Sequence, residues 1–284
     1  MATKGEASPK KASSKPDIAT IGGLALALAG ILGGLMLDGG KLTDVAQVTA
    51  LLIVLGGTIG AVMVTTPLPT LIRAAKCLGN VFFERKQSAH QVIDEIISYA
   101  TKARKNSVIS LENDLPNIAD PFLRKAISLS VDGTDLQELR KMMELDIALE
   151  HRSGEAVAKV YEAAGGYAPT IGIIGVVLGL IQVMKHLENI EEVGRGIAVA
   201  FVATVYGVAS ANLFFLPAAG KIKARFHHGL EIKELMLEGV CSIVEGMNPK
   251  LIRIKLEAFG EGEAKSEKVK GSQGAAAQAA AAQS

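Results

Sequence analysis

The side chains best placed to do chemistry are a few polar residues inside long apolar runs. Thr204, Tyr206, Ser210 and Asn212 lie within one such run. Thr204 and Asn212 would lie on roughly one side of a helix. Two interpretations stay open. The pair closes onto backbone carbonyls or links neighbouring helices, or it lines a polar path beside a charged group that another protein supplies.

Two prolines accompany the apolar runs. Pro169 lies near the start of one run, and Pro217 directly follows another. Each proline removes one backbone hydrogen bond and favours a bend in a helix. We therefore expect local kinks at both positions.

Four apolar runs contain no Asp, Glu, Lys, Arg or His: residues 18–37, 45–66, 166–184 and 196–216. A protein that moves ions across a membrane normally has an ionisable group at membrane depth. Either this chain moves no ions, or a partner helix supplies the carboxylate.

Each run has about 20 residues, enough to cross the hydrocarbon as a helix. Helix is also the form that satisfies backbone groups in lipid. The first run is long enough to span, and no small-x-small cleavage site in it is followed by a soluble chain, which argues against a signal peptide. The fold class is therefore an all-α membrane protein. Its four transmembrane helices form two hairpins, with a large helical cytoplasmic domain between spans two and three.

Basic residues predict the orientation. They precede the first run, follow the second and follow the fourth, whereas the two short links contain few of them. By the positive-inside rule both termini and the long middle segment are cytoplasmic.

Six regions follow from this pattern. They are a disordered cytoplasmic N-terminus (1–17), a hairpin of spans one and two (18–66), a helical cytoplasmic domain (67–165), a hairpin of spans three and four (166–217), a cytoplasmic helix (218–260) and a disordered tail (261–284).

Local signals place helices in the middle segment. Ser88 and Gln91 predict a capping box, and Asp120 before Pro121 predicts a capped helix start. Asp135 opens a long helix toward span three, with a predicted break near Gly165 and its neighbour Gly166.

Small residues four positions apart recur in the runs, at Gly30/Gly34, Gly56/Gly60, Gly175/Gly179 and Gly207/Ala211. They predict close helix packing within the membrane, within or between subunits.

Enzyme chemistry is not indicated. The five histidines are scattered, and neither they nor Cys77 and Cys241 have metal-ligand spacing. No phosphate-binding loop stands in a credible context, and the net charge of +1 suggests no nucleic acid partner. We expect no cofactor and no metal.

Three blocks resemble the MotA/PomA family, the larger subunit of the flagellar stator. They are residues 104–114, residues 166–180 with Pro169, and residues 203–217 with Thr204 and Pro217. The resemblance covers nearly the whole chain. It implies a pentameric ring around a dimer of a MotB/PomB-type subunit, which brings the ion-binding aspartate and a peptidoglycan-binding domain.

The resemblance also assigns roles. It implies that Arg104 and Glu112 contact the rotor protein FliG, with Lys105 and Asp114 as secondary candidates. A purely structural interpretation of these charges is an ordinary solvated loop. Pro169 and Pro217 would couple ion binding to conformational change, and Thr204 would face the ion path.

The coupling ion is predicted from two positions. Sodium-type members of the family tend to have threonines where this chain has Val176 and Ala203, so protons are favoured over a sodium-driven, PomA-type motor. Two competing functions stay open: an ExbB/TolQ-type proton-channel energiser, which usually has three spans, and a structural membrane protein without transport.

Overall fold

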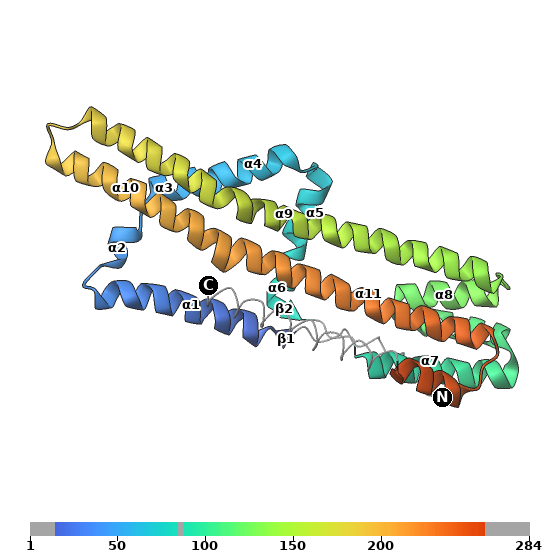
Figure 1. The fold of residues 1–284 in the computed structure, drawn as a ribbon. Coiled ribbons are helices and arrows are strands. Elements are labelled where there is room, and N and C mark those ends of the chain that lie inside the picture. The colour runs from blue at the N-terminus through green and yellow to red at the C-terminus, as the bar shows by residue number, and fades with distance from the viewer. Residues whose placement is uncertain (1–14, 85–87, 259–284) are drawn as a thin grey trace, which may run out of the picture. The chain divides into compact units, whose positions relative to one another are not determined.

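The computed structural model describes residues 15–84 and 88–258, nearly all of them helical (Figure 1). Contacts divide the described residues into two compact units. The membrane unit contains residues 15–84 and 152–226, and the second unit contains residues 88–151 and 227–258. The predicted tail, 261–284, and most of the predicted disordered N-terminus lie outside the described residues.

The membrane unit begins with a series of short and long elements. These are β1 (Lys15–Pro16), α1 (Ile18–Leu37), α2 (Leu42–Val45), α3 (Val48–Leu51), the π-helix η1 (Leu52–Gly56), α4 (Gly57–Thr65), α5 (Leu68–Cys77), α6 (Gly79–Phe82) and β2 (Phe83–Glu84). β1 and β2 form a two-residue antiparallel ladder, with Lys15 opposite Glu84. Lys15 to Asp17 are thus ordered, and the predicted disorder of residues 1–17 does not extend to them.

Long helices complete the membrane unit and continue into the second unit. They are α9 (Leu136–Lys185), α10 (Ile190–Ala209), the π-helix η3 (Ser210–Phe215) and α11 (Leu216–Val244). The last three follow one another without a break. Four helical stretches are long and apolar enough to cross a membrane: Ile18–Leu37, Val48–Thr65 and parts of Leu136–Lys185 and Ile190–Val244. The predicted all-α class with four spans is confirmed.

The predicted break near Gly165 and Gly166 is wrong. α9 runs through both glycines and through Pro169 without interruption. Glycine weakens an isolated helix by about 1 kcal/mol relative to alanine, but here packing decides. Gly165 is buried, and a Cβ atom built on it would lie 2.5 Å from Cδ2 of Leu216. Contact with the last helix thus holds this segment helical.

The core of the membrane unit joins α5, α9 and α11. Val157, Ala158 and Ile222 are buried in it, together with Ala74. The Tyr161 hydroxyl donates a hydrogen bond of 2.8 Å to the Ala74 carbonyl. This bond satisfies a buried polar group and ties α5 to α9.

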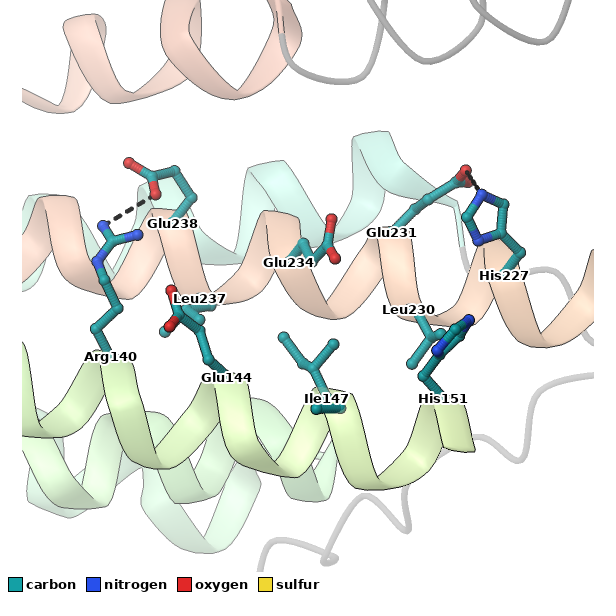
Figure 2. Close-up of a pocket in the computed structure, with 11 residues that line it drawn as sticks. Arg140, Glu144, Ile147, His151, His227, Leu230, Glu231, Glu234, Leu237 and Glu238 are labelled. Carbon is teal, nitrogen blue, oxygen red and sulfur yellow. Dashed lines mark hydrogen bonds and ion pairs between the residues drawn. The ribbon is translucent and has the colours of Figure 1, made fainter. Parts of the chain in front are cut away.

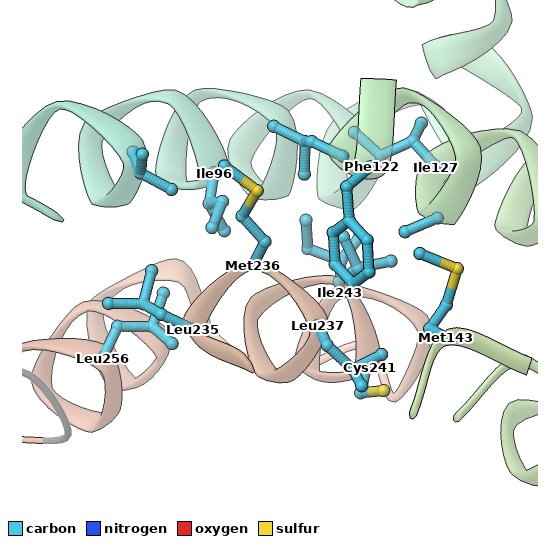
Figure 3. Close-up of a cluster of buried hydrophobic side chains, with 14 of the residues drawn as sticks. Ile96, Phe122, Ile127, Met143, Leu235, Met236, Leu237, Cys241, Ile243 and Leu256 are labelled. Atoms are coloured by element: carbon cyan, nitrogen blue, oxygen red, sulfur yellow. The ribbon is translucent and has the colours of Figure 1, made fainter. Parts of the chain in front are cut away.

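The second unit is built from α7 (Ala89–Asn106), the 3-10 helix η2 (Val108–Asn117), α8 (Pro121–Val131) and a helical segment at residues 249–258. Residues 136–151 of α9 and residues 227–244 of α11 lie side by side in it (Figure 2). Ile96, Phe122, Met143 and Met236 come from four different helices and meet in one apolar core (Figure 3). Burial of this core holds the unit together.

Two of the three predicted helix starts are confirmed. The Asp120 carboxylate accepts hydrogen bonds from the N–H groups of Phe122 and Leu123, and Asp135 accepts one from Gln137. The prediction of a capping box at Ser88 is wrong, because its side chain makes no capping hydrogen bond. The apolar face of α7 fixes that helix instead, since it is buried in the core.

Candidate functional site

Spans three and four pack as a close helix pair. α9 and α10 run antiparallel (Figure 1). A Cβ atom built on Gly179 would lie 2.8 Å from the carbonyl oxygen of Gly196, and one on Gly172 would lie 3.0 Å from that of Ala203. Glycine is therefore required for the observed separation of the backbones. The predicted role of Gly179 in close packing is realised within the subunit.

Two of the predicted small-residue pairs have no close neighbour among the described residues. A Cβ atom built on Gly30, Gly34, Gly56 or Gly60 would find no atom within 4 Å. None of the residues of α1 is buried. In the part of the chain that the structure describes, nothing packs closely against these positions of spans one and two.

Pro169 lies inside α9 at the contact with span four. It is half-buried, and a Cβ atom on Gly207 would lie 3.2 Å from its Cα atom. Because proline has no N–H, the Gly165 carbonyl loses its usual helical donor. α9 is therefore weakened at the point where α10 supports it.

Thr204 and Asn212 lie on an exposed stripe of span four. The Thr204 hydroxyl donates to the Ala200 carbonyl at 3.4 Å, and the Asn212 amide donates to the Val208 carbonyl at 2.9 Å. Phe201, on the same stripe, is 71% exposed. Both polar groups close onto their own helix, as one interpretation predicts, and both are still exposed on a face that the described residues leave uncovered.

The two positions used to predict the coupling ion differ in burial. Val176 is half-buried. Ala203 is completely buried, and a Cβ atom on Gly175 would lie 2.6 Å from its methyl group. Neither residue has a hydroxyl group. At position 203 the close contact between the helices leaves no room for a larger side chain.

Asn212 and Pro217 share a cavity of about 340 Å³. Thr20 and Gly23 of α1 line its other side, and Lys221 of α11 also lines it. The cavity is mostly apolar in its lining. The structure thus brings Asn212 and Pro217 together, whereas Thr204, Val176 and Pro169 do not line this cavity.

Tyr206 has a role that sequence patterns did not reveal. Its hydroxyl donates a 2.5 Å hydrogen bond to the Val45 carbonyl and accepts one of 3.3 Å from the Gln47 N–H. It therefore fixes the backbone just before α3 against α10. The partners are about 160 residues apart in the chain, so no local pattern could identify them.

The predicted rotor-contact residues lie in the second unit. Arg104 and Lys105 are exposed in the last turn of α7, and Glu112 is exposed on η2. Asp114 is half-buried and bonds to Lys102 at 2.7 Å. Arg104, Lys105 and Glu112 are thus available to a partner, whereas Asp114 is engaged within the chain. Lys102 was not predicted.

The turn between these charges has one unusual residue. Ser107, between α7 and η2, has a φ of 70°. A residue other than glycine is uncommon there. Leu111, 1% exposed, anchors η2 in the core below the turn. The buried Leu111 therefore packs η2, which carries Glu112, against the core.

A groove of about 550 Å³ also lies in the second unit, between α9 and α11 (Figure 2). Arg140 bonds to Glu238 across it at 3.1 Å, and Glu144 and Glu234 line it. No predicted site residue lies in this groove. Among the described residues no cluster of His, Cys, Asp or Glu could hold a metal ion.

Comparisons with known proteins now decide the family. Residues 21–107 match the family described as Motility protein A N-terminal, and residues 114–235 match the MotA/TolQ/ExbB proton channel family. Motility protein A of Helicobacter pylori is 34% identical over 240 residues, which are 84% of this chain and 93% of the relative. The chain belongs to the MotA family.

Further similarities agree with membership of the MotA family. Chemotaxis protein PomA of Vibrio alginolyticus is 31% identical, over 86% of this chain and 95% of PomA. The structure of C. jejuni MotAB has a chain that superposes with a TM-score of 0.81 at 31% identity, covering 86% of this chain and 95% of that one. The flagellar MotAB stator complex from Bacillus subtilis gives a TM-score of 0.79 at 32% identity, covering 85% of this chain and 95% of that one. The resemblance inferred from three short blocks is confirmed for the MotA family.

Proposed function

We propose that this MotA-family chain is a flagellar motor stator subunit. With a MotB-type partner it conducts protons across the bacterial inner membrane and converts the ion flow into torque on the rotor protein FliG. The solved relatives are MotAB complexes, one of them described as a flagellar stator, which supports the partnership and the oligomeric assembly.

The observation that carries the proposal is the chemistry of the four spans. They contain no Asp, Glu, Lys, Arg or His, and the exposed stripe with Thr204 and Asn212 is polar only through groups bonded to their own helix. Ion passage needs an ionisable group at membrane depth. The aspartate of a MotB-type helix, placed beside Thr204, supplies it.

Assembly into a ring, a pentamer by family resemblance, would cover the open faces of spans one and two. Gly30, Gly34, Gly56 and Gly60 allow close approach of another helix. Pro169 and Pro217 are the proposed coupling residues, because a helix without a hydrogen bond at these points bends at low cost.

Protons are the proposed coupling ion. Sodium binds through oxygen ligands, and Val176 and Ala203 offer no hydroxyl group. A proton requires only the partner's carboxylate and a path for water. Replacing sodium by potassium in the medium should leave swimming unchanged, and loss of swimming without sodium would favour a PomA-type motor instead.

The contact with FliG is proposed for Arg104 and Glu112, with Lys105 beside them, because all three side chains are exposed. The second unit would then be cytoplasmic, together with both termini. Charge complementarity favours rapid, reversible engagement that weakens with salt.

An ExbB/TolQ-type energiser is the competing function within the same proton channel family. Four candidate spans and the match to the Motility protein A N-terminal family favour the stator. A reporter fused after Ser284 tests the topology. Four spans place both ends of the chain on the cytoplasmic side, so a periplasmic reading would favour the energiser, which usually has three spans.

The decisive experiment deletes the gene for this chain and purifies the tagged protein from a complemented strain. We expect loss of swimming and co-purification of a MotB-type subunit. In liposomes the chain alone should conduct no protons. Normal swimming of the deletion strain without a second stator, or robust conduction by the chain alone, would contradict the proposal.

A further inference from the structure

Asp17 is a buried carboxylate directly before span one. Its side chain is 8% exposed, and it is the one charged residue among the described residues that is buried. It caps α1 by accepting the Thr20 N–H at 3.1 Å. Its own N–H donates to the Phe82 carbonyl at 2.8 Å.

Two cations of α11 hold this carboxylate. Lys221 Nζ lies 2.5 Å and Arg225 Nη2 lies 2.7 Å from Asp17 Oδ2. An isolated buried charge is strongly unfavourable, so its partners are essential. The hydrogen bond from Lys221 is the largest cause that keeps the pKa of Asp17 well below its usual value, despite burial. The carboxylate therefore stays ionised at any physiological pH.

The cations occupy a particular place on α11. Lys221 and Arg225 follow Pro217 by one and two helical turns, and the π-helix η3 ends directly before α11. π-Segments and prolines are points where a helix changes direction. Asp17 therefore binds the first two turns of α11 that follow Pro217, the position where span four is expected to bend.

We infer that Asp17 is a positioning residue that transmits movement of α11 to span one. A bend at Pro217 displaces Lys221 and Arg225, and their shared carboxylate carries the start of α1 with them. The cavity between α1 and η3 leaves space for such movement, since it is about 340 Å³ in volume. This inference rests on the proposed stator function, which requires movement in the spans.

The substitution Asp17→Asn isolates the charge. Asparagine caps helices about as well as aspartate, so α1 keeps its capping group and loses only the ion pairs. In the full-length complex with its MotB-type partner, we expect normal membrane levels and a swimming speed reduced roughly twofold or more, as for residues along coupling networks.

Glu162→Gln is the matched control. Glu162 pairs with Lys223, on the same stretch of α11, at 2.6 Å, but both side chains are 40% or more exposed. Both substitutions turn a carboxylate into an amide, and in both the partner cations lie on α11. Because an exposed pair contributes little, we expect wild-type swimming. Asp17→Glu, which retains the charge, should recover much of the speed.

A second measurement reports directly whether the ion pairs of Asp17 hold α1 to α11. Spin labels at Ile21 of α1 and Ala224 of α11, with Cys77 and Cys241 replaced by serine, give the distribution of distances between the helices. Asp17→Asn should broaden this distribution and Glu162→Gln should not. If Asp17→Asn lowers the protein level, Lys221→Gln, which leaves Arg225 as a partner, provides the same test.

The outcomes separate the two proposals. Wild-type swimming and an unchanged distance distribution for Asp17→Asn would overturn the inference and leave the stator function intact. If swimming does not depend on the chain at all, the stator function fails, and the spin-label distances still report whether Asp17 holds α1 to α11.

Discussion

Gly207 of α10 lies directly against the backbone carbonyl of Ala168 on α9. A Cβ atom on Gly207 would stand 2.7 Å from that oxygen and 3.2 Å from the Cα atom of Pro169. Backbone atoms on both sides leave no flexible group to give way. Spans three and four are therefore held at a separation that only glycine permits at this position.

Gly207→Ala should destabilise the helix pair. Overpacking a close contact typically costs about 1–3 kcal/mol, so we expect a lower unfolding temperature in detergent and reduced swimming. Gly220→Ala is the control, since Gly220 lies on the same continuous helix and its added methyl group would meet nothing within 4 Å. A Gly207→Ala protein as stable as Gly220→Ala would contradict the packing argument.

Thr204→Val should separate function from stability. The Thr204 side chain is exposed and its hydroxyl donates a hydrogen bond to the Ala200 carbonyl of its own helix. We expect the unfolding free energy to change by less than about 0.5 kcal/mol, whereas swimming is strongly impaired. Val205→Ala, on the same exposed turn, is the control and should swim normally. A motile Thr204→Val strain would show that this face does not serve the ion path.

Arg104→Glu should weaken rotor engagement without unfolding the second unit. Arg104 is exposed, and a reversed charge opposite a complementary partner surface is repulsive. Swimming should fall, and its dependence on intracellular salt should change. Lys141→Glu reverses an exposed charge elsewhere, on α9, and should have little effect. Equal losses in both variants would point to net charge rather than to a specific contact.

Asp114→Asn tests a different property of the same region. Asp114 bonds to Lys102 with side-chain exposures of 26% and 36%, and such pairs contribute about 0–1 kcal/mol. We expect a small loss of stability in chemical denaturation. The charge-swapped double variant Lys102→Asp with Asp114→Lys should restore most of it. Failure of the swap to restore stability would show that the ion pair is not the cause.

The contribution of Asp17 to stability should depend on pH in one direction. Its pKa is lowered in the folded protein, chiefly by the hydrogen bond from Lys221. A carboxylate with a lowered pKa stabilises the fold above its unfolded-state pKa, about 3.9, and this stabilisation is lost as the pH falls further. The difference in unfolding temperature between wild type and Asp17→Asn should therefore be constant near pH 7 and shrink below about pH 4. A difference that grows with acidification would have the wrong sign.

Composition and the local sequence were enough to predict the four spans and their helical form, and the resemblance of three short blocks indicated the family. Hydropathy over about 20 residues is a sum of local terms, and it does not depend on what a helix packs against. The capped starts at Asp120 and Asp135 were predictable for the same reason, because a cap involves only the next few residues.

Only the tertiary structure showed which of these residues make contacts between helices. Gly30 and Gly179 occur in the same small-residue pattern, yet only Gly179 touches a neighbouring backbone in this chain. α9 continues through Gly165 because Leu216, 51 positions away in sequence, packs against it. The sequence placed Asp17 in a predicted disordered N-terminus, whereas in the structure Lys221 and Arg225 enclose its carboxylate. In each case the deciding partner is distant in the chain, and such contacts depend on the arrangement of helices, which a local pattern does not contain.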